Sequence, residues 1–305
     1  MIFNRVPVMD AYVIHAFSDG SCNSNCVWCI RHYDLFKKCL VGTITYKQFE
    51  NFLSLNEDCK KPLVPYGLGE PTIHKDFVPF CELALEKGWE LQSIHTNLSQ
   101  PHLPMKVLGT LVKFKAVTVN IGGISEKTQQ LNMGTSLKET MINITLLAQL
   151  KKAYASDVEI TVKMVVNKNN ISDVKLIKLL SDSLPELKIK TYPVYFSVSD
   201  GSEEDKQCFF EQNLLWGIEV PCRETIVDEA GQIVVKSKLK RCYGLVPTIH
   251  VNGRVSVCCR SRWYGEYVGD AFRTPMGVIL RSRAYREAVK RAKRREYVEY
   301  CKFCS

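Results

Sequence analysis

The chain has 305 residues, of which 46% are hydrophobic, so it can bury a sizeable core and is expected to form one large and one smaller domain. It contains no run of eighteen apolar residues, and its N-terminus lacks the basic-then-apolar pattern of a secretion signal. These features exclude a helical membrane span and predict a cytoplasmic protein with no membrane partner. Seven of the nine excess positive charges lie in residues 281–295, so the net charge of +9 is mostly local.

Strand-like and helix-like segments alternate through the first two thirds of the chain. Short apolar segments rich in β-branched or aromatic residues predict six strands, over residues 11–17, 63–68, 90–96, 116–121, 158–166 and 187–196. Helices are predicted over residues 46–53, 77–87, 137–154 and 174–184. The alternation predicts parallel strands with right-handed crossovers, in an α/β fold of the partial (β/α)6 barrel type. The active site of such a fold lies at the C-terminal ends of the strands.

The last third of the chain is predicted to be organised differently. A polar stretch with the turn signal Asp200-Gly201 predicts a boundary between a domain of residues 1–200 and one of residues 201–305. Further on, Asn252-Gly253 favours the two-residue turn of a β-hairpin, and a basic helix follows over residues 281–295. The second domain is therefore expected to be a small cysteine-rich hairpin-plus-helix unit.

Three cysteines, Cys22, Cys26 and Cys29, follow the first predicted strand. In a chain with 13 Cys and no secretion signal, they indicate metal ligation rather than disulfides. A Zn²⁺ site or a four-iron cluster normally takes four ligands, so three thiolates leave one coordination position open for chemistry. The alternatives are a structural zinc knuckle with a distant fourth ligand, or three unrelated thiols.

Glycine and polar residues follow the next three predicted strands. Gly67-Leu68-Gly69-Glu70-Pro71 comes after the second strand, where Gly69 permits close backbone approach and Glu70 offers an acceptor for an ammonium group. His95-Thr96-Asn97-Leu98 closes the third strand, and Asn120 closes the fourth. These residues are expected at the same end of the sheet as the cysteine loop.

The Cys-x3-Cys-x2-Cys spacing, with Trp28 before the last Cys, resembles the radical S-adenosylmethionine (SAM) enzymes. The resemblance implies that the three Cys hold a [4Fe–4S] cluster, that SAM chelates its fourth iron, and that SAM cleavage releases a 5′-deoxyadenosyl radical. Gly69-Glu70-Pro71 is similar to the family's Gly-Gly-Glu-Pro motif, which binds the methionine ammonium, although Leu68 replaces its first Gly. The family also implies SAM contacts for Asn97 and Asn120, and the aromatic ring of Trp28 could pack against the adenine of SAM or shield the cluster. Packing in the core for Trp28, and capping of a strand end for Asn97, are the alternatives.

Four C-terminal cysteines, Cys242, Cys258, Cys301 and Cys304, form a second set of soft ligands suited to Zn²⁺ or an Fe–S cluster. Beside the radical SAM motifs, their spacing resembles the twitch domain, a truncated relative of the SPASM domain. This implies one auxiliary [4Fe–4S] cluster, and so two clusters in all, with structural zinc as the alternative. Four protein ligands would leave that cluster no open position, which indicates electron transfer. Cys259 is a spare thiol, either a small buried hydrophobe or, as in certain radical SAM epimerases, a hydrogen donor.

The resemblance implies an enzyme of the oxidoreductase or epimerase type that abstracts hydrogen from a peptide or sugar-type substrate. Dehydrogenation, epimerisation with Cys259 as hydrogen donor, and crosslinking are the possible outcomes. The expected partners are a peptide or small-molecule substrate and an electron donor such as flavodoxin or ferredoxin. The competing hypothesis is a zinc-stapled binding protein that uses its basic helix on an acidic partner or RNA. It does not explain Gly69-Glu70-Pro71, and no interleaved aromatic and basic pattern supports nucleic-acid binding.

Overall fold

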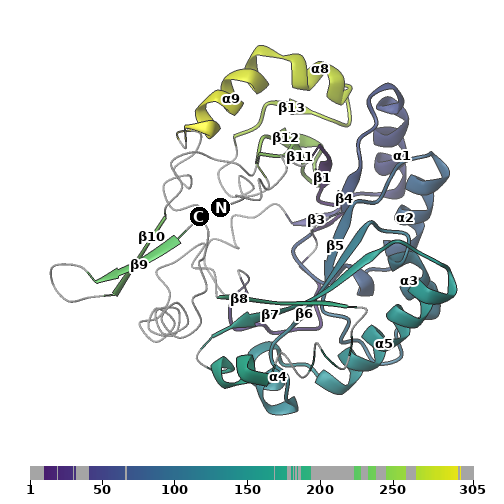
Figure 1. Ribbon diagram of the computed structural model, residues 1–305. Coiled ribbons are helices and arrows are strands. Elements are labelled where there is room, and N and C mark those ends of the chain that lie inside the picture. Colours follow the sequence, from purple (N-terminus) through teal and green to yellow (C-terminus); the bar gives the residue numbers. More distant parts are fainter. Residues whose placement is uncertain are drawn as a thin grey trace.

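The computed structural model describes residues 10–18, 20–29, 31, 41–65, 67–167, 169–176, 180, 182, 184, 187–193, 223–227, 233–237, 245–258, 266–294 and 296. Within these residues the strands form an open, curved arc, and most of the helices lie on its outer side (Figure 1). The arc is the framework that positions the candidate site.

Six parallel strands follow one another around the arc. Their bounds are β1 (Tyr12–Ile14), β4 (Leu63–Pro65), β5 (Ser93–Thr96), β6 (Ala116–Ile121), β7 (Glu159–Val166) and β8 (Lys188–Pro193). β1 pairs with β4, and β5 to β8 pair in chain order, all in parallel. A single parallel bridge between Leu63 and Leu91 joins the two groups. The predicted partial (β/α)6 barrel is confirmed.

The first predicted strand, residues 11–17, is divided in two. The chain turns at its middle, where the Ala16 N–H donates to the Ile14 carbonyl at 2.9 Å. A short second strand, β2 (Phe17–Ser18), then pairs in antiparallel fashion with β3 (Gly42–Thr43). This turn redirects the chain from the end of β1 into the cysteine loop.

The helices cover the outer face of the arc, and the main hydrophobic core lies between the two layers (Figure 1). β6 shows the pattern: Val117, Val119 and Ile121 are fully buried on the outer face, while Thr118 and Asn120 are half-buried on the inner face. The helices of this part of the chain are α1 (Tyr46–Leu55), α2 (Phe77–Glu86), α3 (Met105–Leu111), α4 (Glu126–Met133) and α5 (Leu137–Ala153). Short 3₁₀ helices are η3 (Glu57–Cys59), η4 (Pro71–Ile73) and η5 (Ile171–Leu176).

α3 and α4 were not predicted, and the helix predicted over residues 174–184 is tested only in part. α3 is seven residues long, and α4 is mostly polar, so neither shows a long apolar stripe. α4 is stabilised at its ends instead, by a capping box between Ser125 and Thr128 and by Gly134 in the left-handed region (φ 66°). The helix predicted over residues 174–184 starts within η5, and most of its remainder lies outside the described residues.

The C-terminal hairpin joins the barrel sheet. β11 (Thr248–Ile249) pairs in antiparallel fashion with β12 (Arg254–Ser256) around Gly253 (φ 82°), which confirms the predicted hairpin. β13 (Gly269–Asp270) extends it, and β11 also pairs in parallel with β1, giving the order β13-β12-β11-β1-β4. The strands that the sequence assigned to a second domain thus extend the sheet of the first. The predicted boundary at residues 200 and 201 lies outside the described residues.

The basic helix predicted over residues 281–295 is confirmed as α9 (Arg283–Lys293), and a separate helix, α8 (Met276–Arg281), ends just before it. Ser282 separates them with an extended backbone (ψ 154°), and its hydroxyl accepts from the Tyr285 N–H at 3.1 Å as the cap of α9. The continuous run of charge concealed this break. A separate hairpin, β9 (Arg223–Val227) and β10 (Ile233–Ser237), extends away from the arc (Figure 1). Among the described helices, none has the length and apolar character needed to cross a membrane.

Candidate functional site

The loop with Cys22, Cys26 and Cys29 begins just after β2, at the C-terminal end of β1. All three thiols are half-buried. The Cys29 N–H donates to the Cys26 carbonyl at 2.9 Å, and the Ser24 N–H donates to Cys22 Sγ at 3.4 Å. The loop is therefore a folded turn that fixes the backbone between its cysteines.

The three thiols are close enough to affect each other's ionisation. Burial, and then the neighbouring Cys29 and Cys22, raise the pKa of Cys26 to about 12. Burial also raises the pKa of Cys22. Metal ligation deprotonates such thiols. Across the described residues no three His, Cys, Asp or Glu side chains converge on one point as ligands of a single ion. A [4Fe–4S] cluster requires a wider arrangement, because each thiolate binds a different iron, and a loop of three soft donors fits it.

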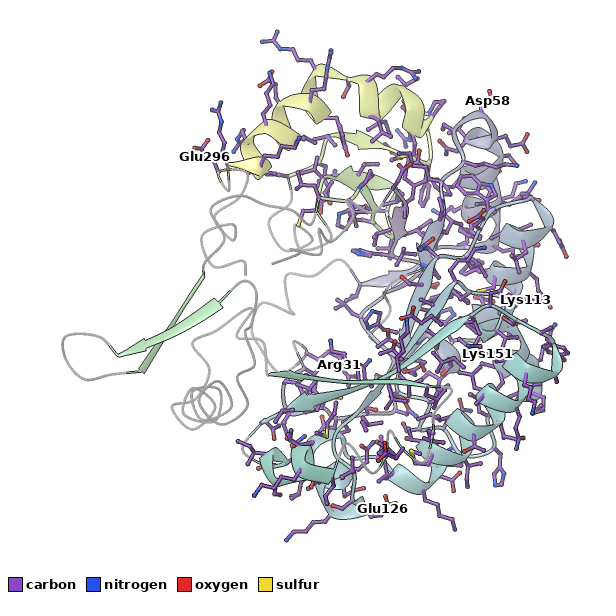
Figure 2. The ribbon with its side chains drawn as sticks, in the orientation of Figure 1. Arg31, Asp58, Lys113, Glu126, Lys151 and Glu296 are labelled. Carbon is purple, nitrogen blue, oxygen red and sulfur yellow. The ribbon has the colours of Figure 1, made fainter. Side chains whose placement is uncertain are left out.

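Arg31, labelled in Figure 2, holds the two ends of this loop together. Its Nη1 donates to the Gly20 carbonyl at 3.2 Å, and its Nη2 donates to the Ser24 carbonyl. The guanidinium also hydrogen-bonds Cys29 and interacts electrostatically with the other two thiols. A permanent positive charge therefore lies beside the three candidate ligands. Sequence reasoning overlooked Arg31, although it lies two residues after the last Cys.

Gly67 and Gly69 bring the segment after β4 into contact with β2 and with the start of the cysteine loop. A Cβ on Gly69 would lie 2.2 Å from the Ser21 carbonyl oxygen, and one on Gly67 would lie 2.1 Å from that of Phe17. The Glu70 N–H donates to the same Ser21 oxygen at 2.9 Å. Close approach at Gly69 was predicted, and the structure shows that its partner is the cysteine loop itself.

Glu70 lies between β4 and η4 as the N-cap of η4, and it is buried, with 4% of its surface exposed. Its Oε1 accepts from the Thr72 N–H at 3.1 Å, the Thr72 hydroxyl at 2.7 Å and the Thr96 hydroxyl at 2.5 Å. Its Oε2 accepts from the Asn97 N–H at 2.6 Å, which leaves this oxygen capacity for a further donor. Burial raises the pKa of the Glu70 carboxyl, and these hydrogen bonds oppose the shift. Pro71 follows as the first residue of η4.

Asn97 ties the end of β5 to the cysteine loop. Its Nδ2 donates to Ser24 Oγ at 2.7 Å and Asn23 Oδ1 at 2.9 Å, and lies 3.9 Å from Cys22 Sγ. The next residue, Leu98, is fully buried and has φ 47°, in the left-handed region that favours glycine. The Asn97 amide is therefore engaged by the loop in this structure, and its predicted contact with SAM stays a prediction.

Asn120 lies on the inner face of the barrel together with two basic side chains. The register pairs Asn120 with Lys163 on β7, and places His95 of β5 on the same face. His95 is exposed at this face. Desolvation by the protein atoms around its ring, and then the charge of Lys163, lower the pKa of His95 to about 4. The inner face thus combines an amide, a cation and a neutral imidazole. Trp28 is half-buried between Cys26 and Cys29, and its predicted adenine contact stays a prediction.

The C-terminal end of α4 supports the cysteine loop from the other side. The Val27 N–H donates to the Asn132 carbonyl at 2.9 Å, and the Asn25 N–H donates to the Met133 carbonyl at 2.7 Å. Asn132 is fully buried, and its Nδ2 donates to the Gly122 carbonyl after β6 at 2.6 Å. Its Oδ1 accepts at 2.9 Å from two amides that follow β7, those of Asn167 and Asn169. Sequence analysis missed this support, although Ser125 and Gly134 were available as signals for the ends of α4.

Of the C-terminal ligand candidates, only Cys258 is among the described residues. It lies half-buried after β12, and its carbonyl accepts from the Ser256 hydroxyl at 3.0 Å. Cys242, Cys259, Cys301 and Cys304 lie outside the described residues, so their predicted roles stay predictions.

Comparisons with known proteins agree with this geometry. Residues 245–305 match the SPASM family, described as an iron-sulfur cluster-binding domain. The fold is similar to that of anSMEcpe with bound AdoMet (16% identity, TM-score 0.59, covering 96% of this chain and 87% of that one). It is also similar to that of Streptococcus suis SuiB bound to its precursor peptide SuiA (12% identity, TM-score 0.58, covering 98% of this chain and 71% of that one). A third similar structure is BtrN in complex with AdoMet and 2-DOIA (13% identity, TM-score 0.53, covering 97% of this chain and 93% of that one). No curated protein sequence matches the chain significantly.

The chain has the radical SAM fold with a C-terminal SPASM domain. The SPASM match begins three residues after Cys242 and includes the other three predicted ligands of the auxiliary cluster. The resemblance inferred from the cysteine spacings is confirmed at this level.

Two buried histidines connect the radical SAM barrel to the SPASM domain. The rings of His15, after β1, and His250, after β11, pack edge to face with centroids 4.9 Å apart. Both side chains are at most 1% exposed. His250 Nε2 lies 2.9 Å from Ser256 Oγ, which in turn donates to the Cys258 carbonyl. Sequence analysis singled out neither histidine, because their proximity depends on the pairing of β1 with β11.

Proposed function

We propose that this protein is a radical SAM enzyme with two [4Fe–4S] clusters that abstracts hydrogen from a peptide or sugar-type substrate. The observation that carries the proposal is the docking of the cysteine loop onto Gly69 and Glu70, in a chain whose C-terminal part matches the SPASM domain. Cys22, Cys26 and Cys29 would hold the first cluster. Cys258, with Cys242, Cys301 and Cys304, would hold the second.

The residues around the loop have the chemistry needed to bind SAM. Glu70 Oε2 keeps hydrogen-bond acceptor capacity for the methionine ammonium, and burial would make such an ion pair strong. Asn120 and Lys163 suit the ribose hydroxyls and the carboxylate, and Trp28 suits the adenine ring. When bound, the cofactors supply a hydrogen-abstracting radical, since one electron breaks the C5′–S bond of SAM to give methionine and a 5′-deoxyadenosyl radical.

A peptide is the first substrate class to test. Structures of anSMEcpe with the Cp18Cys peptide and of SuiB with its precursor peptide both share this fold. The BtrN complex with 2-DOIA makes a small-molecule substrate the second class.

The fate of the substrate radical defines the reaction. Loss of one electron to the auxiliary cluster and of one proton to solvent would give a dehydrogenated product. Transfer of the Cys259 thiol hydrogen to the radical would give an epimer and a thiyl radical, which one electron and one proton then return to the thiol. We propose these two outcomes, with the electron supplied by a donor such as flavodoxin or ferredoxin.

Anaerobic reconstitution with iron and sulfide tests the proposed function. We expect about eight Fe per chain, from two four-iron clusters, and release of 5′-deoxyadenosine when SAM and dithionite are added. Cys26→Ala should abolish this release and reduce the iron content by about half. The matched control Cys59→Ala removes a half-buried thiol near η3 and should change neither result. Colourless protein with stoichiometric zinc would contradict the proposal.

A second substitution separates the two outcomes. Cys259→Ala should leave 5′-deoxyadenosine release intact in both cases. If Cys259 is the hydrogen donor, no epimer forms and solvent deuterium no longer enters the product. Normal epimer from this variant would remove Cys259 from the mechanism.

A further inference from the structure

α9 has one apolar side, and that side covers the region of Cys258. Ala288 and Ala292 are buried, and Tyr285 and Val289 are partly buried beside them. These residues form a small hydrophobic cluster with Val257, Leu245 and Cys258. The helix therefore packs directly on the candidate ligand of the auxiliary cluster, and its other side faces outward.

The outward side of α9 carries a stripe of cations, which we call the basic stripe. Its members are exposed and recur at helical spacing, so that they share one face: Arg283, Arg286, Lys290, Lys293 and Arg294. The stripe is about 16 Å long, from the rise of about 1.5 Å per residue. Side chains of this helix point away from the body of the molecule (Figure 2).

Little negative charge balances the basic stripe. Lys290 pairs with Glu287 at 3.4 Å, and Arg291 at the edge of the stripe pairs with Glu266 at 3.5 Å. Within the described part of the chain, the other four members of the stripe form no ion pair. Cations three or four residues apart on a helix repel each other, which destabilises the helix. An acidic surface placed against the stripe would reverse this cost.

We propose that the basic stripe is the docking surface for a small acidic electron-transfer protein, an inference that rests on the proposed function. Because the opposite side of α9 packs on Cys258, a carrier bound here is separated from the auxiliary cluster by little more than the helix. On docking, the reduced carrier loses one electron and an iron–sulfur centre of the enzyme gains it, with no atom transferred. The same charges would steer the encounter and raise its rate.

Other acidic partners suit this surface less well. A substrate must bring a C–H bond to the inner face of the barrel, whereas the stripe points away from the sheet that α9 covers. RNA binding would benefit from aromatic side chains between the cations, but the aromatic residue of α9, Tyr285, lies on its buried side. A carrier protein needs only proximity and complementary charge.

The test compares two variants of equal charge change in the full-length, reconstituted protein. One carries Arg283→Gln, Arg286→Gln, Lys293→Gln and Arg294→Gln. The control carries Lys113→Gln, Lys127→Gln, Lys138→Gln and Lys152→Gln, four exposed lysines of the barrel. The probe is flavodoxin, with binding followed by surface plasmon resonance at several salt concentrations, and a short single-stranded RNA is measured in parallel.

We expect the stripe variant to bind flavodoxin with an association rate at least about 10-fold lower at low salt, and with a weaker salt dependence. The control variant should match the parent. Flavodoxin-driven release of 5′-deoxyadenosine should fall with binding, while dithionite-driven release stays unchanged in both variants. Equal flavodoxin binding by the two variants would overturn the proposal, as would stripe-dependent binding of RNA without binding of flavodoxin. If the parent protein releases no 5′-deoxyadenosine with dithionite, the proposed function is refuted instead. The two failures can be told apart, because flavodoxin binding is measured separately from SAM cleavage.

Discussion

The Val27 N–H donates to the carbonyl oxygen of Asn132 at 2.9 Å, so the cysteine loop rests on the last turn of α4. The Asn132 side chain is in turn bonded to the segments that follow β6 and β7. One buried residue thus fixes the loop relative to two strand ends that are expected to contact SAM.

Asn132→Ala should impair the N-terminal cluster specifically. The substitution leaves several buried amide and carbonyl groups unpaired, at a cost of roughly 2–4 kcal/mol in the free energy of unfolding. Asn56→Ala is the matched control, since Asn56 is equally buried and bonds to the Phe52 carbonyl at 2.7 Å and the Met276 N–H at 2.6 Å. Both variants should lose similar stability by denaturant titration. Only Asn132→Ala should change the EPR signal of the reduced N-terminal cluster on addition of SAM, and identical spectra would contradict this role.

Gly69→Ala should displace the cysteine loop. The added Cβ would lie 2.2 Å from the Ser21 carbonyl oxygen, so one of the two backbone segments must move. We expect loss of iron from the N-terminal site and at least a 100-fold reduction in SAM cleavage, in line with the effect of displacing a reacting group by about 1 Å. The comparison is Gly109→Ala on α3, where a Cβ meets nothing within 4 Å. That variant should gain about 0.5–1 kcal/mol of stability and keep its iron.

Leu98→Gly sets two effects against each other. The left-handed backbone at Leu98 costs roughly 1–2 kcal/mol, which glycine would relieve. Loss of the fully buried Leu side chain costs roughly 3–5 kcal/mol, so the variant should be less stable by about 1–4 kcal/mol. Ala155 has nearly the same φ, 46°, and is exposed, so Ala155→Gly should change stability by less than about 1 kcal/mol. Greater stability of Leu98→Gly than of the parent would show that backbone strain dominates.

The stability of the protein should fall as pH drops from about 6.5 to about 4, in part through His95. In the folded state, desolvation by the surrounding protein atoms and the charge of Lys163 hold the pKa of the exposed His95 near 4, whereas an unfolded imidazole titrates near 6.5. Between these values the unfolded chain binds more protons, so acid favours unfolding. His95→Asn should flatten this part of the pH profile, measured as the midpoint of urea unfolding. An unchanged slope would mean that His95 is as easily protonated in the folded state as in the unfolded chain.

Much of the barrel could be predicted because its strands carry a strong local pattern. β6 has the predicted bounds, since its alternating Val and Ile residues are flanked by polar positions, and β7 differs by one residue. The hairpin turn at Asn252-Gly253 was equally clear, because Gly253 takes the positive φ that the turn requires. The predicted approach at Gly69 also depended on local chemistry alone.

The features that the sequence did not predict depend on contacts between segments far apart in the chain. α4 has few apolar residues, so hydrophobic periodicity could not indicate it, and its importance comes from where its last carbonyls point. The amide of Asn132 has many possible partners, and only the fold selects them. The contact of His15 with His250 follows from a strand pairing that no local pattern encodes.

The pairing of β1 with β11 also bears on how the protein is made. Val13 lies opposite Thr248, so β1 is synthesised long before β11, its partner on this edge. Until then one edge of β1 stays unpaired and can recruit strands from other nascent chains. Contacts so distant in sequence also close slowly. During synthesis an unpaired strand edge therefore lies next to the segment that carries Cys22, Cys26 and Cys29, and early metal loading or chaperone binding would shorten that interval.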